Sequence, residues 1–415
     1  MKVTGLIVEY NPFHNGHLYH LQESRSSTNA DIIICVMSGY FLQRGEPALV
    51  SRRTRTKMAL AGGADIVVEL PYAYSVQHAS LFSRGAVAVL EAMGADTVVF
   101  GSEHGQITPF LELDSFLMDH QAQYESHIQS FVKQGMSYPR ASSAAFSQLN
   151  PGHDLPDILQ PNNILGYNYV KAIRELKAKI KPATIKRIGA GYHEKEKNTQ
   201  SIASATGIRH ELIEKQNHLD AVANTMPSSS FDQLKEDQDH QPDFFHWNLY
   251  YPFLQANLLT ASSSRLRGIY EAEEGLENRF ISHAKQHSSF TAFIEAVKTK
   301  RYTWTRLQRL ATHILTDSDK DLMLKVLQAH KLESIRLLGM NENGQKYLSL
   351  ARNEMEIPLA TKMNREKGPQ ALLDEKAALA YFLPLSPSKR IKRYKEEYSL
   401  PPVRFVSKEG RFLSN

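Results

Sequence analysis

The chain has 415 residues, of which 42% are hydrophobic and 22% are charged, which describes a soluble globular protein of two or three domains. Its one cysteine, Cys35, excludes a disulfide framework and indicates a reducing, cytoplasmic setting. No apolar run reaches the about 18 residues of a membrane helix, and the short N-terminal apolar stretch is no signal peptide. The net charge of +5 is compatible with a polyanionic partner.

The N-terminal 21 residues predict a strand, a short loop and a helix in that order. Residues 3–8 are mostly apolar and β-prone, an Asn-Pro dipeptide ends the run, and a helical pattern begins at Asn15, the expected N-cap. His14 and His17 flank Gly16 at this helix start. This combination indicates a nucleotide-binding loop. The first helical turn offers free N–H groups, the imidazole rings add donors, and the glycine leaves room for a phosphate.

Residues 14–17, His-Asn-Gly-His, resemble the HxGH signature of the nucleotidyltransferase superfamily, which class I aminoacyl-tRNA synthetases share. The signature is more specific here because it follows a strand and the tripeptide at residues 11–13, Asn-Pro-Phe, at the N-terminus. Two alternatives stay open. The histidines could have structural roles at the helix start, or His14, His17 and His20 could bind zinc, although no cysteine or acidic ligand set is near.

The next part of the chain predicts an α/β fold. Further strands are expected at residues 31–37, 65–70, 96–100 and 183–188, with helical patterns at 48–61 and 78–93 between the earlier ones. Near-continuous apolar strands that alternate with helices predict a Rossmann-like domain with a parallel sheet covered on both faces. Ligands bind such sheets outside the carboxyl ends of the strands.

A basic helix is expected after the second strand. It carries Arg52, Arg53, Arg55 and Lys57, which we expect on a solvated face, with one or two of them able to reach a triphosphate. A further helix is expected after Pro161, where one of Asn162 and Asn163 would be the N-cap and the other amide would be free to read a base or a ribose.

A second phosphate-binding segment is predicted at residues 201–209. Ser204 and Thr206 precede a helical run that includes Arg209, and the segment resembles the C-terminal signature of the superfamily. This resemblance implies that the two hydroxyl groups and the guanidinium group bind the β- and γ-phosphates across from the first motif.

The second half is expected to be mainly helical. Residues 216–245 are polar and acidic and predict a linker or a long excursion between an ATP-binding domain at 1–215 and a helical region at 246–415. Helical patterns fall at 244–259, 264–287, 290–300, 304–316 and 318–329. Basic and aromatic residues occur together there, which predicts an RNA-binding surface, the alternative being a solvated bundle with a basic tail. The candidate RNA contacts are Arg301, Arg306, Arg309, Lys389, Arg390, Lys392 and Arg393.

Several stretches are jointly similar to the bacterial tRNA(Met) cytidine acetate ligase family, and the similarity extends over nearly the whole chain. They are NPFHNGHLYHL, MSGYFLQRGEPA, GADIVVELPYAYSVQHA, FGSEHG, PNNILGYNY, SIASATGIR, EGLENRF, YTWTRLQRL and IRLLGM. The resemblance implies ATP-dependent N4-acetylation of the wobble cytidine of elongator tRNA(Met) with acetate, through an acetyl-adenylate. It also implies Mg²⁺ with the ATP. From the residues themselves we expect no protein-bound metal, no membrane and no obligate protein partner.

The same resemblance makes His14 and His17 the expected catalytic residues. The expected ATP contacts are Val8, Asn11, Pro12, Phe13, His14, Asn15, Gly16, His17, Gly101, Asn162, Arg187, Ser204, Thr206 and Arg209.

Three other functions share parts of this pattern. A small-molecule adenylyltransferase would share both motifs but leaves the basic, aromatic second half without a purpose. A class I synthetase-like enzyme would have a KMSKS-like loop, and SATGIR stands in its place. A non-catalytic nucleotide-binding scaffold would bind ATP without turnover.

Overall fold

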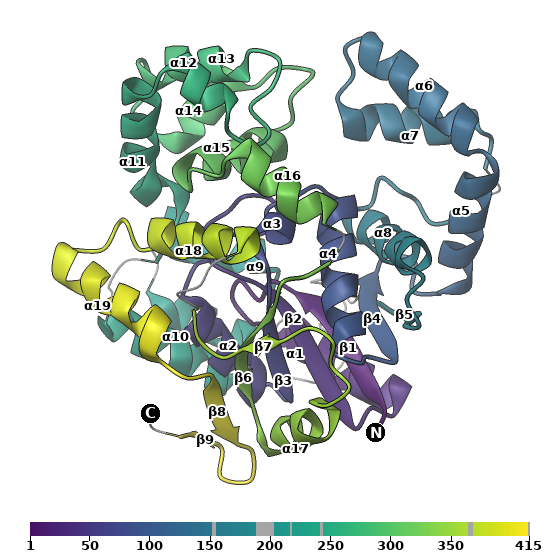
Figure 1. The fold of residues 1–415 in the computed structure, drawn as a ribbon, viewed down its shortest axis with the longest axis vertical. Helices are drawn as coiled ribbons and strands as arrows, with labels where there is room; N and C mark the ends of the chain where they lie inside the picture. The colour runs from purple at the N-terminus through teal and green to yellow at the C-terminus, as the bar shows by residue number, and fades with distance from the viewer. Residues whose placement is uncertain are drawn as a thin grey trace.

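The computed structural model describes residues 1–151, 155–187, 203–215, 218–240, 244–329, 331–363 and 368–413. In this part of the chain, nine strands form one sheet in the order β5-β4-β1-β2-β3-β6-β8-β9, with β7 paired to β6 (Figure 1). The five predicted strands are confirmed as β1 (Val3–Val8), β2 (Ile32–Ser38), β3 (Ile66–Leu70), β4 (Thr97–Ser102) and β5 (Lys181–Lys186), and they run parallel. Residue 188 of the last prediction lies outside the described residues.

Side chains of β2 alternate between two hydrophobic cores, as the two-residue period of a strand requires. Ile32, Ile34 and Val36 belong to one core, whereas Ile33 and Cys35 belong to the other. The first core is covered by α4 (Ala79–Ala92) and α8 (Pro161–Leu176), and the second by α1 (Asn15–Thr28) and α2 (Arg52–Ala61). The predicted sheet with helices on both faces is therefore confirmed. Because β4 lies on the opposite side of β1 from β2, the strand order reverses between β1 and β4, where sheets of this kind bind ligands.

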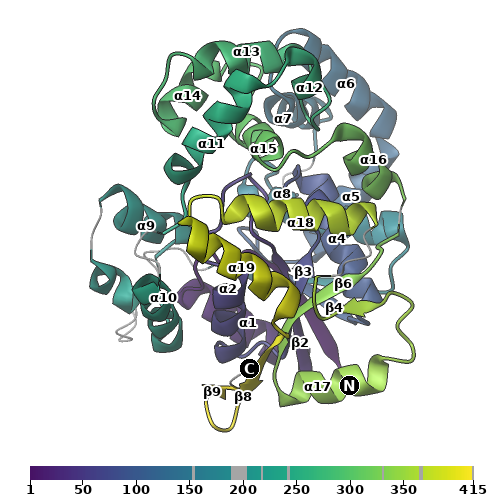
Figure 2. The ribbon, with the colours of Figure 1, turned by 60° about the vertical axis from the view of Figure 1, so that its left-hand side comes forward.

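Most of the remaining helices extend beyond the carboxyl edge of the sheet or along its faces (Figures 1 and 2). Residues 108–148 form α5 (Thr108–Asp119), α6 (Gln121–Lys133) and α7 (Tyr138–Gln148), of which α6 and α7 form a projecting hairpin. The predicted helical region forms a bundle of α11 (Trp247–Thr260), α12 (Ser263–Arg267), α13 (Leu276–Ala284), α14 (Phe290–Val297), α15 (Trp304–Leu315) and α16 (Lys320–Gln328). None of the described helices has the length and apolar character needed to cross a bilayer.

After this bundle the chain returns to the sheet, which the sequence did not lead us to expect. β6 (Ile335–Met340) pairs antiparallel with β3, and β8 (Val403–Val406) pairs parallel with β6. The other elements of this return are β7 (Leu359–Ala360), α17 (Glu342–Ala351), α18 (Pro369–Tyr381), α19 (Pro387–Ser399) and β9 (Arg411–Phe412). The C-terminal region is mainly helical, as predicted, but it also completes one edge of the sheet.

The predicted linker contains two helices, η3 (Leu219–Thr225) and α10 (Ser228–His240). α10 lies against α2, where Thr54 Oγ1 donates to Asp237 Oδ1 at 2.7 Å and the Lys57 ammonium lies 3.1 Å from a Glu236 oxygen. The division of the chain into domains at residues 215 and 246 stays a prediction.

The expected solvated basic face of α2 is wrong for two of its arginines, because α2 is packed between the sheet and two other helices. Arg55 is 0% exposed, and its guanidinium donates to the carbonyl groups of Glu9 at 2.8 Å, Ser38 at 3.0 Å and Gly39. Burial lowers the pKa of Arg55 to about 10. Arg52 is also buried and forms ion pairs with Glu69 and with Glu397 of α19. The Arg52 charge is thus paired, and the Arg55 charge is stabilised by three carbonyl groups, as burial demands.

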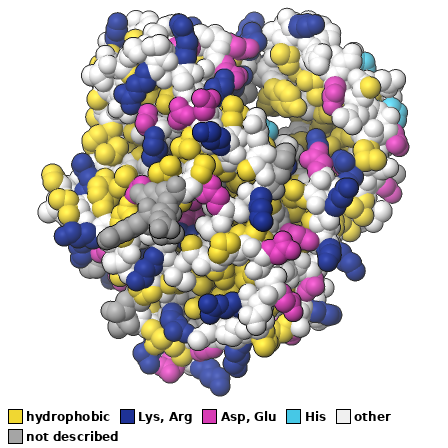
Figure 3. All heavy atoms as spheres, in the orientation of Figure 1, with side chains coloured by type: hydrophobic (Ala, Val, Ile, Leu, Met, Phe, Trp, Pro, Cys, Tyr) yellow, Lys and Arg dark blue, Asp and Glu magenta, His cyan; other side chains and the backbone are white. Residues whose placement is uncertain are grey.

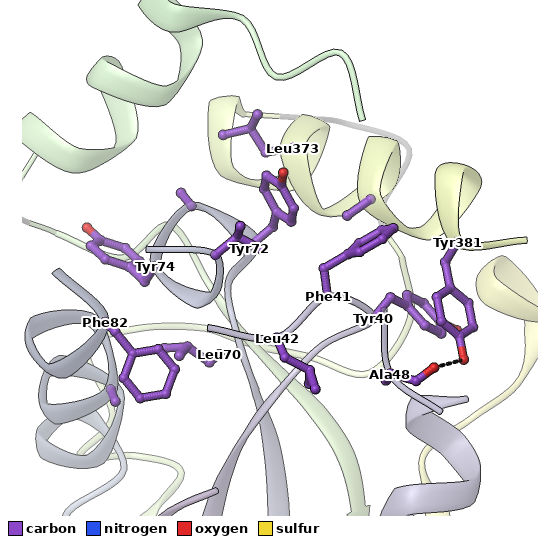
Figure 4. Close-up of a cluster of buried hydrophobic side chains, with 14 of the residues drawn as sticks. Tyr40, Phe41, Leu42, Ala48, Leu70, Tyr72, Tyr74, Phe82, Leu373 and Tyr381 are labelled. Carbon is purple, nitrogen blue, oxygen red and sulfur yellow. Dashed lines mark hydrogen bonds between the residues drawn. The ribbon is translucent and has the colours of Figure 1, made fainter. Parts of the chain in front are cut away.

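The loop after β2 joins the sheet to the helical bundle. The carbonyl group of Gly45 accepts from the Trp247 indole at 3.0 Å and from the Thr312 hydroxyl at 2.8 Å, and the Gln308 amide donates to the neighbouring Arg44 carbonyl at 2.9 Å. Residues on both sides of this loop enter a buried aromatic cluster, in which the Tyr381 hydroxyl donates to the Ala48 carbonyl at 2.9 Å (Figure 4). The carbonyl groups of Arg44, Gly45 and Ala48 thus accept hydrogen bonds from side chains of the second half of the chain.

We expect Gly45→Ala to destabilise the protein more than Gly135→Ala does. Both glycines have positive φ, +79° and +88°, so each alanine costs about 1–2 kcal/mol of backbone strain. A Cβ at Gly45 would also lie 2.8 Å from backbone atoms of Arg309, whereas nothing lies within 4 Å at Gly135. Overpacking adds about 1–3 kcal/mol. Chemical denaturation of both variants measures this difference, and equal losses would contradict the role of Gly45 in docking.

Candidate active site

The start of α1 lies outside the carboxyl end of β1, next to the position where the strand order reverses. His14, rather than the predicted Asn15, is the N-cap, with Nδ1 accepting from the Gly16 N–H at 3.0 Å. The His17 ring closes the capping box by accepting from the His14 N–H at 3.4 Å. An imidazole nitrogen thus replaces the side-chain oxygen of a usual cap, and Asn15 donates instead to the Asn224 carbonyl at 3.0 Å.

Burial keeps both motif histidines neutral at pH 7. It lowers the pKa of His14 to about 4, with smaller effects from the guanidinium groups of Arg187 and Arg209. Burial and the adjacent His14 ring, stacked at 3.8 Å, also lower the pKa of His17. Since Nδ1 of neutral His14 accepts a hydrogen bond, its Nε2 carries the proton. None of the hydrogen bonds among the described residues involves this N–H, so it can donate to a ligand.

Arg209 brings the second predicted motif to the first. Its guanidinium donates to the Asn11 carbonyl at 2.9 Å and forms a 3.0 Å ion pair with Glu46. It comes from α9 (Ala205–Arg209), whose N-cap Ser204 accepts from the Gly207 N–H at 3.0 Å. α9 continues into η2 (His210–Glu214). Residues 201–202 of the predicted motif lie outside the described residues.

The predicted contacts Gly101, Asn162 and Arg187 also lie together. The Arg187 guanidinium donates to Asn162 Oδ1 at 3.1 Å, and a Cβ on Gly101 would lie 3.1 Å from Arg187 Cγ. His20 is the next neighbour of Gly101, and His20 Nε2 is buried with no partner in the described part of the chain. This group lies at the ends of β4 and β5. Arg187 is close enough to the His14 ring to lower the pKa of His14.

The expectation that Asn162 or Asn163 is the N-cap of α8 is wrong, because Gln160 takes that position. The N–H group of Asn163 donates to Glu103 at 2.8 Å, and Glu103 also accepts from the Asn162 amide at 2.5 Å. Asn163 Oδ1 accepts from the backbone of Glu103 and His104. Sequence analysis missed Glu103 because it caps the helix from a strand end that is distant in sequence.

Two expected ATP contacts face the core. Phe13 is 0% exposed and packs on the Tyr10 ring at 4.7 Å, and Val8 is 8% exposed. Only their backbone groups, with those of the buried Pro12, are available for a ligand. Asn11 is different, because Oδ1 accepts from the Leu49 N–H at 2.7 Å while Nδ2 is buried without a partner among the described residues.

The predicted RNA-contacting arginines of the bundle are paired with acidic side chains. Arg301 pairs with Glu274, Arg306 lies 3.8 Å from Glu273, and Arg309 lies 3.0 Å from Glu271. On α19, Arg390 donates to the carbonyl groups of Leu383 and Leu385, and Arg393 pairs with Glu396. Lys389 and Lys392 on the same helix are exposed. Charges of both signs are interspersed over the face in Figure 3.

Within the described residues, no group of three or more His, Cys, Asp or Glu side chains is arranged to hold a metal ion. The zinc alternative for His14, His17 and His20 therefore has no carboxylate or thiolate partner in this part of the chain.

Comparison with known proteins identifies the family. The family model described as HIGH Nucleotidyl Transferase matches residues 1–397. The tRNA(Met) cytidine acetate ligase of Geobacillus sp. (strain WCH70) is 45% identical over 407 residues, which are 97% of this chain and 100% of the relative. The chain belongs to the tRNA(Met) cytidine acetate ligase family. The member from Bacillus subtilis (strain 168) is 43% identical over 419 residues, 100% of both chains.

Solved structures agree with this family assignment. Thermotoga maritima TmcAL bound with alpha-thio ATP superposes with a TM-score of 0.87 at 32% identity and covers 97% of this chain and 99% of that one. The apo form also has a TM-score of 0.87, at 33% identity, with 98% and 100% coverage. The resemblance to tRNA(Met) cytidine acetate ligases that the sequence motifs indicated, and the predicted fold class, are both confirmed.

We expect His14→Asn to reduce the pH dependence of stability in this member of the tRNA(Met) cytidine acetate ligase family. Asn is a good N-cap, so the helix start is kept. The unfolded imidazole binds a proton below about pH 6.5, whereas folded His14 does so only near pH 4, so wild-type stability falls as the pH drops through this window. Urea unfolding at pH 7 and pH 5 should show that the wild type loses about 2 kcal/mol more than the variant. His218→Asn, at an exposed position, is the control, and the same pH dependence in all three proteins would contradict a buried neutral His14.

Proposed function

We propose that this protein is the cytoplasmic ligase that uses ATP to activate acetate and acetylates N4 of the wobble cytidine of elongator tRNA(Met), with release of AMP and pyrophosphate. The observation that carries the proposal is the convergence of the α1 N-terminus, Arg187 and Arg209 around the His14 ring. The chain is also similar, over nearly its whole length, to relatives named tRNA(Met) cytidine acetate ligase.

The proposed ATP site spans both motifs. The first N–H groups of α1 and the free His14 Nε2–H would bind the α- and β-phosphates, and Arg209 with the hydroxyl groups of Ser204 and Thr206 would hold the departing pyrophosphate. Ser204 accepts from Gly207, so its own proton is free to donate. Gly101, Asn162 and Arg187 would contact the rest of the nucleotide. ATP enters as its magnesium complex, because Mg²⁺ binds mainly phosphate oxygens and water.

Two reactions follow from this arrangement. An acetate oxygen attacks the α-phosphorus in line with the leaving pyrophosphate, which requires positioning and charge stabilisation rather than a protein nucleophile. The guanidinium groups of Arg187 and Arg209 and the neutral His14 and His17 rings lie where negative charge would build up. The N4 amino group of the cytidine then attacks the acetyl carbon, and AMP leaves.

The second half of the chain is the proposed tRNA surface. The bundle and the α6–α7 hairpin rise beyond the carboxyl edge of the sheet (Figure 1). The space-filling view shows a hollow between them (Figure 3). α19 adds exposed lysines beside α2, to which it is tied by the Arg52–Glu397 ion pair. A cytidine that donates its amino group must leave the base stack, so the anticodon would be splayed toward the site.

The direct test is nucleoside mass spectrometry of tRNA after incubation with the protein, ATP and acetate. We expect one N4-acetylcytidine per elongator tRNA(Met), with AMP and pyrophosphate formed in equal amounts, and no product with His14→Ala or His17→Ala. Adenylyl transfer to a small molecule with tRNA ignored would instead identify a small-molecule adenylyltransferase. ATP binding without pyrophosphate release would identify a scaffold.

A second test concerns the α19 lysines. Neutral substitution of the three exposed lysines should weaken tRNA binding. It should also reduce the slope of log K against log salt concentration by about 2, because each lost phosphate contact reduces the slope by about 0.7–0.9. The substitutions are Lys389→Gln, Lys392→Gln and Lys395→Gln.

A matched control makes the same charge change at the opposite edge of the sheet. Lys2, Lys179 and Lys181 are exposed near the amino ends of β1 and β5, away from the proposed site. Their substitution by Gln should leave the salt slope unchanged. Equal slopes for both triple variants would contradict a role of α19 in tRNA binding.

A further inference from the structure

Glu9 is a carboxylate at the end of the central strand β1 to which the mechanism above gives no role. Its backbone is fixed, because its carbonyl group accepts from the buried Arg55 guanidinium at 2.8 Å. Its side chain is fixed through one oxygen, since Oε1 accepts from the Gln43 N–H at 2.8 Å. None of the hydrogen bonds among the described residues involves the second oxygen, Oε2. Glu9 thus presents one free carboxylate oxygen from a rigid position.

The Glu9 carboxylate lies beside the loop that carries Glu46, the ion-pair partner of Arg209. Arg44, Glu46 and Arg209 are close enough to Glu9 to act on its pKa, and Arg209 also acts on the pKa of His14. Burial is the largest effect and raises the pKa of Glu9, while the Gln43 N–H opposes it. A carboxylate with a raised pKa is a stronger proton acceptor than a solvated one, which suits a general base.

We propose that Glu9 is the general base of the acetyl-transfer step, taking the proton of the cytidine amino group. The inference rests on the proposed function. The N4 lone pair forms a bond to the acetyl carbon, the bond between that carbon and the phosphate oxygen breaks, and AMP leaves with the electron pair. One N4 proton passes to the free oxygen of Glu9, which later releases it to water.

The other candidate proton acceptors of the site are weaker or already engaged. Burial lowers the pKa of His20 to about 4 and raises that of Glu9, so His20 Nε2, which is unpartnered among the described residues, is the weaker acceptor. His14 Nε2 carries a proton, and its Nδ1 accepts from Gly16. Glu46 is held in the ion pair with Arg209, and both oxygens of Glu103 accept from the start of α8. Among the described residues, Glu9 has a free oxygen and, unlike Glu46, forms no ion pair.

Glu9→Gln is the test, because glutamine keeps an acceptor for the Gln43 N–H and cannot accept the proton. Acetate-dependent exchange of pyrophosphate into ATP measures the first step, and single-turnover transfer from isolated acetyl-adenylate to tRNA measures the second. We expect exchange within about twofold of the wild type and transfer slower by about 10²- to 10⁴-fold. The rate of transfer by the wild type should rise with pH through the pKa of Glu9 and then level off. This pH dependence should be absent in Glu9→Gln. Glu9→Asp should keep the pH dependence but transfer more slowly.

Glu91→Gln is the matched control, since Glu91 also accepts a backbone N–H, that of Lys179 at 3.1 Å, but lies at the opposite edge of the sheet. It should leave both steps unchanged. Transfer by Glu9→Gln within twofold of the wild type overturns the inference, and so does an equal loss of exchange and transfer, which would mean a structural or adenylation role. A wild-type protein that exchanges pyrophosphate but never acetylates tRNA would overturn the proposed function itself.

Discussion

The structure depends most on one buried cation, the guanidinium group of Arg55. It donates to carbonyl groups at the ends of β1 and β2, which belong to Glu9, Ser38 and Gly39. Carbonyl groups at the end of a buried parallel strand have no ladder partner, and leaving them unpaired costs about 1–3 kcal/mol each. Arg55 satisfies three of them with one side chain. It thereby fixes the edge of the sheet from which the His14 motif and Glu9 both extend.

The loop that follows β2 transmits this fixed geometry to the helical bundle. Gly45 is held by Trp247 of α11 and Thr312 of α15, so the bundle is seated directly on the loop that also positions Glu9 through Gln43. The proposed RNA surface and the proposed nucleotide site therefore share one structural support. Their spacing is set by a few hydrogen bonds rather than by a flexible linker.

The sequence was informative where the determinants are local. The parallel strands were predicted because each is a short apolar run. The two candidate phosphate-binding motifs were each predicted from consecutive residues. Features that depend on distant partners were missed: Glu103 caps α8 from the end of β4, and β6 pairs with a strand formed early in the chain. The burial of Arg52 and Arg55 was missed for the same reason, since a charged helix is read as solvated unless its covering elements are known.

The position of β6 between β3 and β8 has a consequence for biosynthesis. The nascent polypeptide emerges with β3 at an open edge, and the strand that covers this edge is translated only after the entire helical bundle. Exposed strand edges are templates for intermolecular pairing. Ribosome-bound intermediates and prematurely terminated products of this gene would therefore carry an uncovered hydrophobic edge, and they would need chaperones or rapid degradation to avoid aggregation.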